Sequence, residues 1–290
     1  MIRKMFFAIL AMGILATSCN SDDDNNFSTT NLVLNLEGLD ALGDDFVYEG
    51  WIIVEGAPIS TGRFSSIIFP QSFAVETSQL ANASTFVLTI EPSEDPEPGP
   101  AATKILAGDF TGSSANVGST GLVGDFSNAS GNYILATPTD TDMNNEESGV
   151  WFLNNSSGTA VTGLNLPDLG AGWKYEGWAV IDGVPVSTGT FTAADMADDN
   201  ASTSNFKGEA GDGPNFPGED FLQNAPDNLI FPTDLKGTTI VITVEPNPDN
   251  SPQPFTFKPL AHMVPVNAAN HTTIAMGIGP LTSLSGMVIR

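Results

Sequence analysis

The sequence contains one motif twice, and this internal repeat limits the possible folds more than any other feature. Tyr48-Glu49-Gly50-Trp51 recurs as Tyr175-Glu176-Gly177-Trp178, at an offset of 127. The residues that follow agree at the same offset, in the pattern Y-E-G-W-x4-G-x-P-x-S-T-G-x-F. A second block, residues 86–92, matches residues 240–246 at an offset of 154, so the second copy holds 27 additional residues. A repeat of this length predicts two units of one fold.

Within each copy the residues are those of short strands joined by turns. Residues 48–54 and 86–90 are rich in β-branched and aromatic residues, which favour strands. Glu55-Gly56 and Asp182-Gly183 are typical of tight hairpin turns. About seven such runs per copy, with Gly, Pro, Asn and Asp between them and no helical stripe, predict an all-β fold: a tandem of two antiparallel β-sandwich domains.

We expect the first sandwich over residues 27–155 and the second over residues 156–290. Each copy passes from Glu-Pro through a proline-rich loop to a Lys-x-Leu-Ala step, and ends with Ser-Gly and an apolar run, at residues 148–153 and 285–289. The additional residues of the second copy predict an inserted loop at about 195–228. Each copy is long enough to bury its own core, so the two are expected to fold separately.

Together these motifs resemble a known family. The Y-E-x-W strand, the G-x-P-x-S-x-G-x-F segment and the T-x-E-P step before a proline-rich turn resemble the C-terminal extracytoplasmic domain of anti-sigma-K factors. The resemblance covers most of each copy and implies that domain's fold and an extracytoplasmic setting. Members of the family also have an inner-membrane helix and a cytoplasmic domain that binds a sigma factor. Neither part is expected in the short stretch before the first strand, so sigma-factor inhibition is not implied.

The first residues predict export and lipid anchoring. Two basic residues precede an apolar run at residues 5–15, which is shorter than the roughly 20 residues that a membrane-spanning helix needs. Residues 15–19, Leu-Ala-Thr-Ser-Cys, resemble the lipobox of bacterial lipoproteins, which implies a signal peptide at residues 1–18 and an acylated Cys19. An ordinary secretory signal is the alternative. Cys19 is the only cysteine, so the chain has no internal disulfide.

Residues 19–26 form an acidic, polar tether, and such a segment cannot bury apolar surface. The tether resembles the Ser-Asp-Asp type of surface-export signal on lipoproteins of Bacteroidetes-like bacteria, with a solvated spacer as the alternative. We therefore expect an extracytoplasmic protein anchored in the outer membrane, and both the periplasmic and the outward-facing side stay open. The net charge of −25 excludes nucleic acid as a partner, because phosphate contacts need clustered Lys and Arg. Membrane lipid is expected as a partner through the acylated Cys19 alone.

The sequence lacks the common catalytic motifs. It has no G-x-S-x-G, H-E-x-x-H, G-x4-G-K or G-x-G-x-x-G pattern. The two histidines, His262 and His271, are predicted to be surface or loop residues. Structural roles are also expected for the glutamates inside the repeated blocks, which are Glu49, Glu91, Glu176 and Glu245. We therefore expect no catalytic residues and no enzyme activity.

The inserted loop carries the sharper candidates for a site. Its carboxylates alternate with glycines, and Ca²⁺ accepts about six to eight oxygen ligands. The spacing does not match a D-x-D-x-D-G loop, and a mobile surface loop is the alternative to a calcium site. The candidate ligands are Asp198, Asp199, Asp212, Glu219 and Asp220. Trp51 and Trp178 are predicted to be core residues, with exposed sugar-stacking platforms as the alternative.

These features favour a non-enzymatic, lipid-anchored extracytoplasmic protein that binds or senses an unknown protein or glycan ligand. It would consist of two anti-sigma-K-factor-like domains without the sigma-binding part. Two other functions stay open, a surface carbohydrate-binding accessory lipoprotein and a structural surface protein. No cofactor is expected apart from the calcium candidate.

Overall fold

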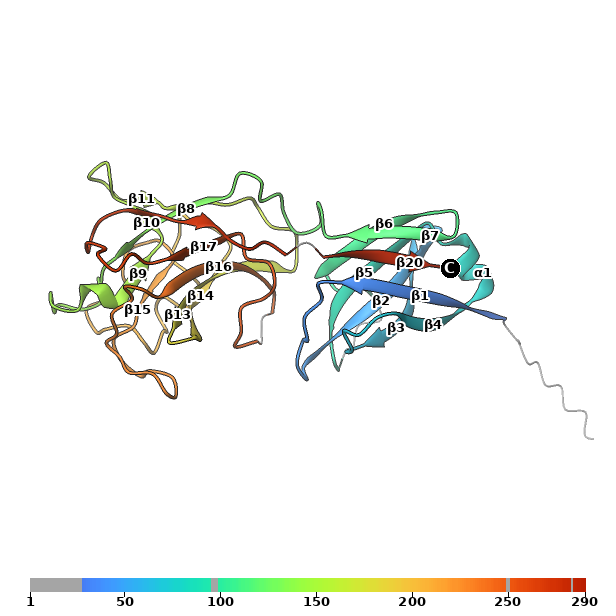
Figure 1. Ribbon diagram of the computed structural model, residues 1–290, viewed down its shortest axis with the longest axis horizontal. Coiled ribbons are helices and arrows are strands. Elements are labelled where there is room, and N and C mark those ends of the chain that lie inside the picture. Colours follow the sequence, from blue (N-terminus) through green and yellow to red (C-terminus); the bar gives the residue numbers. More distant parts are fainter. Residues whose placement is uncertain (1–27, 95–98, 249–250, 283) are drawn as a thin grey trace, which may run out of the picture.

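The computed structural model describes residues 28–94, 99–248, 251–282 and 284–290, and it confirms the predicted all-β class. Among these residues there are twenty strands, one short helix, α1 (Thr77–Asn82), and one 3-10 turn, η1 (Glu146–Ser148). Every strand pairing in the described part is antiparallel. The strands gather in two lobes that lie end to end along the long axis (Figure 1).

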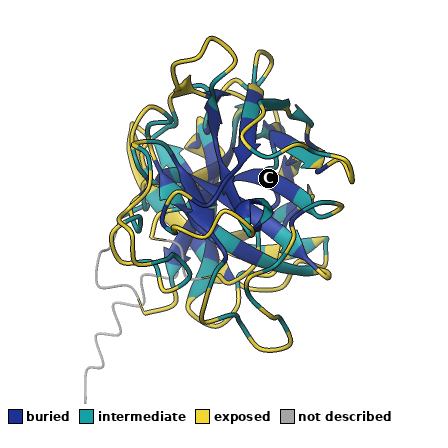
Figure 2. Ribbon diagram, turned by 90° about the vertical axis from the view of Figure 1, so that its left-hand side faces the viewer, coloured by how far each residue is buried: buried dark blue, intermediate teal, exposed yellow. Residues whose placement is uncertain are grey.

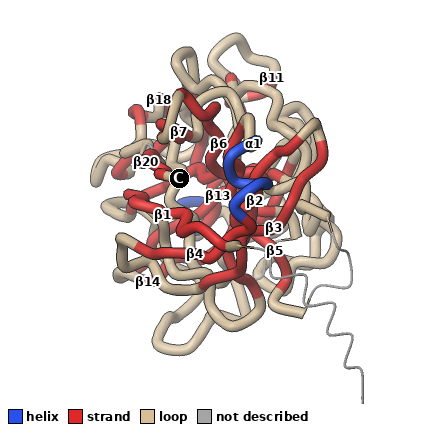
Figure 3. Tube along the Cα trace, turned by 90° about the vertical axis from the view of Figure 1, so that its right-hand side faces the viewer, coloured by secondary structure: helices blue, strands red, loops and turns tan. Residues whose placement is uncertain are grey.

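One eight-stranded sheet builds the first lobe, in the order β3-β2-β5-β6-β7-β20-β1-β4. The sheet curls until its edge strands meet, and the Phe64 ring on β3 lies 5.6 Å from the Phe73 ring on β4. Figure 3 looks onto this lobe and shows its strands arranged around the interior. The strands are β1 (Thr29–Glu37), β2 (Phe46–Val54), β3 (Ala57–Phe64), β4 (Gln71–Glu76), β5 (Thr85–Pro92), β6 (Lys104–Thr111), β7 (Ser114–Gly118) and β20 (Ser285–Ile289).

The second lobe contains a five-stranded sheet, β14-β13-β16-β17-β19, and a second sheet in the order β12-β8-β9-β15. Because β18 pairs with β8 and β19 pairs with β17, residues 274–278 join the two sheets. Figure 2 shows the buried strands of this lobe inside a shell of exposed loops. Its strands are β8 (Ser130–Leu135), β9 (Gly149–Trp151), β10 (Leu153–Asn154), β11 (Val161–Thr162), β12 (Leu164–Asn165), β13 (Trp173–Ile181), β14 (Val184–Phe191), β15 (Gly218–Asp220), β16 (Thr239–Pro246), β17 (Leu260–Met263), β18 (Ile274–Ala275) and β19 (Gly277–Ile278).

The repeated motif forms the same hairpin in both lobes, β2-β3 and β13-β14. The predicted turns are present: Glu55-Gly56 and Asp182-Gly183 each have φ values of 51° and 83°, as a two-residue type I′ turn requires. Opposite the motif glycine, the pairing register shifts by one residue in both hairpins. Thr61 and Thr188 are the additional residues of these two bulges. The Ser-Thr-Gly part of the motif therefore encodes a β-bulge.

The two copies of the repeat exchange strands. β20, from the end of the second copy, lies in the first lobe between β1 and β7. β8, from the first copy, lies in the second lobe and pairs with β12, β9 and β18. Figure 1 shows the red β20 among the blue and green strands of the first lobe. Each lobe is therefore completed by a strand of the other copy.

This pairing differs from the division into residues 27–155 and 156–290 that we expected. Residues 130–154 contribute β8, β9 and β10 to the second lobe, while β20 returns to the first. The strand of the first copy that corresponds to β20 is β8, and not residues 148–153 as we expected. The pairing register shows this: Gly131 of β8 lies opposite Leu164, just as Gly286 of β20 lies opposite Leu36. Neither glycine has room for a side chain: a Cβ on Gly131 would lie 2.8 Å from a methyl carbon of Leu260. Sequence similarity shows which elements the copies share, but not which lobe each strand completes.

Two segments cross between the lobes, residues 119–129 and the stretch that includes residues 279–282 and 284. They lie side by side where the Ser119 N–H donates to the Leu284 carbonyl at 3.2 Å. The first segment also packs on the second lobe, since Gly170 N–H donates to the Val123 carbonyl at 3.0 Å. Buried apolar residues of both lobes form one continuous cluster. The two lobes are therefore joined by hydrogen bonds and apolar packing as well as by the two connecting segments.

Candidate functional site

The repeated tryptophans belong to the core, as predicted. Trp51 is 3% exposed and Trp178 is 2% exposed. Each indole N–H donates to a threonine hydroxyl on the neighbouring strand, Thr89 at 2.9 Å and Thr243 at 2.8 Å. Buried indoles that have found a hydrogen-bond partner are structural anchors. The carbohydrate-binding alternative therefore loses the two exposed platforms on which it rested.

The repeated glutamates also have structural contacts. Glu49 and Glu176 are buried and accept hydrogen bonds from the hydroxyls of Ser60 and Ser187, at the bulge. Glu49 also pairs with Arg63, whose Nε lies 3.1 Å from a carboxylate oxygen. These carboxylates hold the two strands of each hairpin together beside the bulge.

The inserted loop is tied to the second lobe. Its strand β15 pairs with β9, and Phe221 directly after it is fully buried. Three of the predicted metal ligands are buried here, with exposures of 6% for Asp198, 3% for Glu219 and 0% for Asp220. A free, mobile surface loop would not bury carboxylates in this way.

Each of these three carboxylates accepts hydrogen bonds. Asp220 accepts the Trp151 indole N–H at 2.7 Å and the Thr139 backbone N–H at 2.8 Å. Glu219 accepts the backbone N–H of Asp220 at 2.9 Å, and Asp198 accepts the N–H of Gly218 at 3.2 Å. Hydrogen bonds of this kind compensate for the cost of burying polar groups. Asp220 therefore connects the insertion to β9 and to the loop before it, while Glu219 and Asp198 accept hydrogen bonds from within the insertion.

Burial makes these groups easier to protonate. Burial, with a smaller contribution from the charges of Asp198 and Asp220, raises the pKa of Glu219 to about 8. Burial also raises the pKa of Asp198 and of Asp220 to about 6. A carboxyl that holds its proton near neutral pH is a weak ligand for a cation.

The five predicted ligands do not form one cluster. Asp199 pairs with Lys174 at 2.7 Å, and Asp212 pairs with Lys207. In the described part of the chain, no group of three or more His, Cys, Asp or Glu side chains is placed to hold a metal ion. The five candidate ligands are therefore not gathered into one group, and calcium binding stays a prediction. The lipid-attachment residue, Cys19, lies outside the described residues.

The two histidines contact other side chains of the second lobe. His262, on β17, is half-buried, and its Nδ1 lies 3.0 Å from the Tyr133 hydroxyl. His271 lies in a loop, and its Nε2 is 3.1 Å from a carboxylate oxygen of Glu146. The two sites are separate hydrogen-bonded contacts, and His271 is exposed as predicted.

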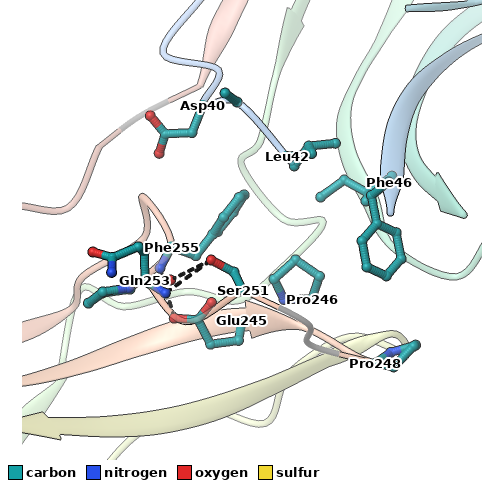
Figure 4. A pocket seen from close by; sticks show the side chains of 12 residues that line it. Asp40, Leu42, Phe46, Glu245, Pro246, Pro248, Ser251, Gln253 and Phe255 are labelled. Atoms are coloured by element: carbon teal, nitrogen blue, oxygen red, sulfur yellow. Dashed lines mark hydrogen bonds between the residues drawn. The ribbon is translucent and has the colours of Figure 1, made fainter. Parts of the chain in front are cut away.

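A cavity of about 330 Å³ lies between the lobes (Figure 4). Residues of the loop after β1 and of β2 and β5 form the first-lobe wall: Asp40, Ala41, Leu42, Phe46 and Ile90. The end of β16 and the proline-rich loop form the second-lobe wall, which includes Glu245, Pro246, Pro248, Gln253, Pro254 and Phe255. Sequence reasoning missed this site because its walls come from different copies of the repeat.

Residues of the repeated motif hold both walls. On the first-lobe side, the Tyr48 hydroxyl donates to the Asp40 carbonyl at 2.7 Å and fixes the loop after β1. On the second-lobe side, a Glu245 carboxylate oxygen accepts the Phe255 N–H at 2.9 Å and closes the proline-rich loop. Glu91 makes the corresponding contact with Ala101 at 2.7 Å. The Y-E-G-W tyrosine and the T-x-E-P glutamate therefore shape the cavity without a chemical role of their own.

The corresponding contact between the other pair of loops, at Gly172, is packed tightly. There the loop before β13 meets the proline-rich loop of the first lobe. A Cβ on Gly172 would lie 2.7 Å from the Thr103 nitrogen and 3.1 Å from the Ala102 Cβ. The same two kinds of loop are therefore in contact twice, once for each copy. Only the contact between the loop after β1 and the proline-rich loop of the second copy leaves this cavity.

Comparison with known proteins supports one family resemblance. The family model described as "Anti-sigma-K factor rskA, C-terminal" matches residues 24–104, a span that reaches from the tether to the first residue of β6. No curated protein and no solved structure matches the chain. The resemblance predicted from the motifs is thus confirmed for the first copy, and it indicates an anti-sigma-factor-like extracytoplasmic domain. No helix in the described part is long and apolar enough to cross a membrane.

Proposed function

We propose that this chain is a non-enzymatic, lipid-anchored extracytoplasmic protein that binds or senses a ligand in the cavity between its lobes. One observation carries the proposal: both walls of the cavity are held by residues of the repeated motif, through Tyr48 and Glu245. Concave sites between domains, mostly apolar with a few polar groups, are where proteins commonly bind small ligands and peptide segments. A ligand in this cavity would contact both lobes at once.

Lipid anchoring rests on Cys19 and on the tether that follows it. Each buried methylene of an acyl chain contributes about 0.8 kcal/mol to membrane binding, so two or three chains hold a protein firmly. The acidic tether would keep the charged body away from anionic lipid headgroups, which repel it. The arrangement would present the lobes at an outer-membrane surface without the sigma-binding part of the resembled family.

The absence of enzyme activity is part of the proposal. The acidic residues that could act in pairs already accept structural hydrogen bonds, including Glu49, Glu245 and Asp220. General acid–base catalysis needs such a group within reach of a substrate proton. The two carboxylates at the cavity, Asp40 and Glu245, stand on walls that belong to different lobes.

Substitution of Cys19 tests the anchor. We expect Cys19→Ala to move the protein from the membrane fraction to the soluble fraction, because the acyl chains can no longer be attached. Fractionation after a high-salt wash measures this, and Ser18→Ala serves as the matched control next to the cysteine. If the Cys19→Ala protein still sediments with membranes, the anchor is not at this residue.

Filling the cavity tests the binding site. Ala41→Trp places a large ring in the cavity, whereas Ala74→Trp places one on an exposed position of β4. We expect proximity labelling on whole cells to lose its specific neighbours in the first variant and to keep them in the second. Thermal melts of both variants check that the fold is intact. An identical set of labelled neighbours in the two variants would refute binding in the cavity.

A further inference from the structure

We propose that the second lobe binds a guanidinium group, the charged end of an arginine side chain, beside its β13-β14 hairpin. The internal repeat carries this inference. The first lobe fills the same position with its own arginine: Arg63 lies opposite Glu49 on the hairpin, and Thr190 lies opposite Glu176 at the matching position. The site is additional to the ligand cavity between the lobes.

In the first lobe, Arg63 links the β2-β3 hairpin to the residues that follow β5. Its Nε lies 3.1 Å from a carboxylate oxygen of Glu49. Its two terminal nitrogens donate to the backbone carbonyls of Pro92 and Ser93, the second at 3.2 Å. A guanidinium is planar and presents its N–H donors as a rigid fork, so it can meet several acceptors at once. These three acceptors show what a guanidinium contacts at this position.

The second lobe has the same three acceptor positions around a cavity. Glu176, Pro246 and Asn247 correspond to the three acceptors at the repeat offsets of 127 and 154. Together with Thr190 they line a cavity of about 380 Å³. The Thr190 hydroxyl donates to Asp199 at 2.7 Å, in the inserted loop. The cavity therefore lies where the first lobe holds the guanidinium of its own arginine.

Glu176 can make this contact while it keeps its hydrogen bond from Ser187. Glu49 is equally buried and does both: it accepts the Ser60 hydroxyl and also pairs with Arg63. The serine of the motif bonds Glu176 in the same way. A carboxylate that already accepts this serine hydroxyl is therefore still an acceptor for a guanidinium in this hairpin.

The charges around the cavity favour a cation. Lys174 also lines it, and its Nζ lies 2.7 Å from a carboxylate oxygen of Asp199. With Glu176, this pair makes two carboxylates and one ammonium, a formal charge of −1. A guanidinium would neutralise that charge, whereas an anion would add to it and to the net charge of −25 on the whole chain.

An NMR titration of the full mature chain tests the site, with N-acetylarginine amide as the probe. We expect the backbone amide signals of Thr190 and Asn247 to shift at millimolar probe concentration, because partly exposed ion pairs are weak. The signals of Arg63 and Ser93 should not move, since the first lobe has its own guanidinium there. N-acetylcitrulline amide keeps the shape of the probe without its charge, and should bind at least roughly fivefold more weakly.

Exchanging the differing residue between the copies gives matched variants. Thr190→Arg supplies the second lobe with its own guanidinium and should abolish the shift at Asn247. Arg63→Thr removes the guanidinium of the first lobe and should make the Ser93 signal respond to the probe. Thr159→Arg adds the same charge at an exposed position outside the lining and should leave the titration unchanged. Melting curves check that each variant is folded.

Three results would each overturn the site: no shift at Thr190 and Asn247, equal affinity for the citrulline probe, or an unchanged titration in Thr190→Arg. The cavity between the lobes shares Pro246 and Pro248 with this one, so Ala41→Trp separates the two. If Ala41→Trp abolishes the shifts, the probe binds between the lobes and the proposed site is wrong. Free arginine distinguishes the sources of the guanidinium. Binding of the blocked probe at least as tightly as free arginine indicates a residue of a peptide, and tighter binding of free arginine indicates the amino acid itself.

Discussion

At the scale of single residues, Tyr48 and Tyr175 connect the core of each lobe to the loop before it. Each hydroxyl donates to a backbone carbonyl eight residues earlier, at Asp40 and at Pro167. Each ring lies 5.5 Å from a phenylalanine of the next strand, Phe64 or Phe191. Burial raises the pKa of both tyrosines, so both hydroxyls stay protonated and remain donors at any physiological pH. Tyr48 thereby fixes the loop that carries Asp40.

The tryptophans give a direct test of the core. We expect Trp51→Ala and Trp178→Ala each to lower the free energy of unfolding by roughly 3–5 kcal/mol, because each removes a buried ring and leaves a cavity. Trp→Phe at the same positions keeps most of the ring and loses the N–H bond to threonine, at a cost of about 1 kcal/mol. Chemical denaturation measures both. Melting curves that do not change in the alanine variants would contradict the burial of these rings.

The buried carboxylates of the insertion predict a pH dependence. Burial raises the pKa of Glu219 from 4.5 to about 8, so the folded protein holds a proton that the unfolded chain has released. Stability from this group is therefore complete below pH 4.5 and is lost as the pH rises to about 8. Asp198 and Asp220 act in the same direction: the stability that each contributes is lost as the pH rises to about 6.

We expect the melting temperature of the second lobe to fall between pH 5 and pH 9, and Glu219→Gln to flatten the upper part of that profile. Scanning calorimetry across the range measures both effects. Glu209→Gln is the matched control on an exposed glutamate. A melting temperature that rises over the same range would contradict the direction of these pKa shifts.

Several residue roles could be predicted from the sequence because each depends on local chemistry. Glu55-Gly56 predicts its turn through backbone conformation, and a repeated Trp51 predicts burial through its size. The burial of Asp220 could not be predicted in this way. Its two main partners, Trp151 and Thr139, lie far away along the chain and are brought to it only by the folded second lobe.

At the scale of elements, β20 completes the first lobe. It pairs with β1 on one side and with β7 on the other, and its Val288 side chain is fully buried. Arg290 fastens the end of this strand: its guanidinium donates to the carbonyls of Leu80, Ala83 and Gly112. The same guanidinium lies 4.5 Å from the centre of the Phe110 ring. Without β20, the first lobe would expose two strand edges and part of its core.

Fragments of the chain test this dependence. Residues 27–155 contain seven strands of the first lobe but lack β20, so we expect no cooperative unfolding transition from them. Gly118 on β7 lies opposite Ser285 on β20, so a short Asn-Gly linker can join residues 28–118 to residues 285–290. We expect this joined fragment to unfold cooperatively in circular dichroism. If residues 27–155 melt as sharply as the joined fragment, β20 is not needed to complete the lobe.

The strands themselves could largely be predicted, and their pairing could not. The β-branched and aromatic residues of β2, β5 and their second copies predict strands regardless of what lies beside them. The choice between β8 and β20 for a given lobe depends on the crossing segments. Both strands begin with Ser-Gly and end in apolar residues, so the local pattern assigns neither strand to a lobe.

At the scale of the whole molecule, the exchange of β8 and β20 makes one body from two copies. The crossing segments contact each other through Ser119 and Leu284, and one apolar cluster extends through both lobes. This continuity fixes the distance between the lobes and therefore the width of the cavity between them. The repeat predicted two similar lobes, but it placed the boundary where each copy ends. The cavity could not be predicted for the same reason, because its two walls come from residues on opposite sides of the boundary between the copies.

Disulfide trapping of β20 tests the central claim, in a Cys19→Ala chain that has no other thiol. Asn35 and Met287 face each other on β1 and β20, so Asn35→Cys with Met287→Cys should form a disulfide within one chain. If β20 instead occupied the place of β8, Ser285 would face Asn165, as Ser130 does now. The account predicts rapid oxidation of the Asn35→Cys/Met287→Cys pair, seen as a shifted monomer on a non-reducing gel. It predicts no oxidation of Asn165→Cys with Ser285→Cys. The reverse pattern would contradict the exchange of strands.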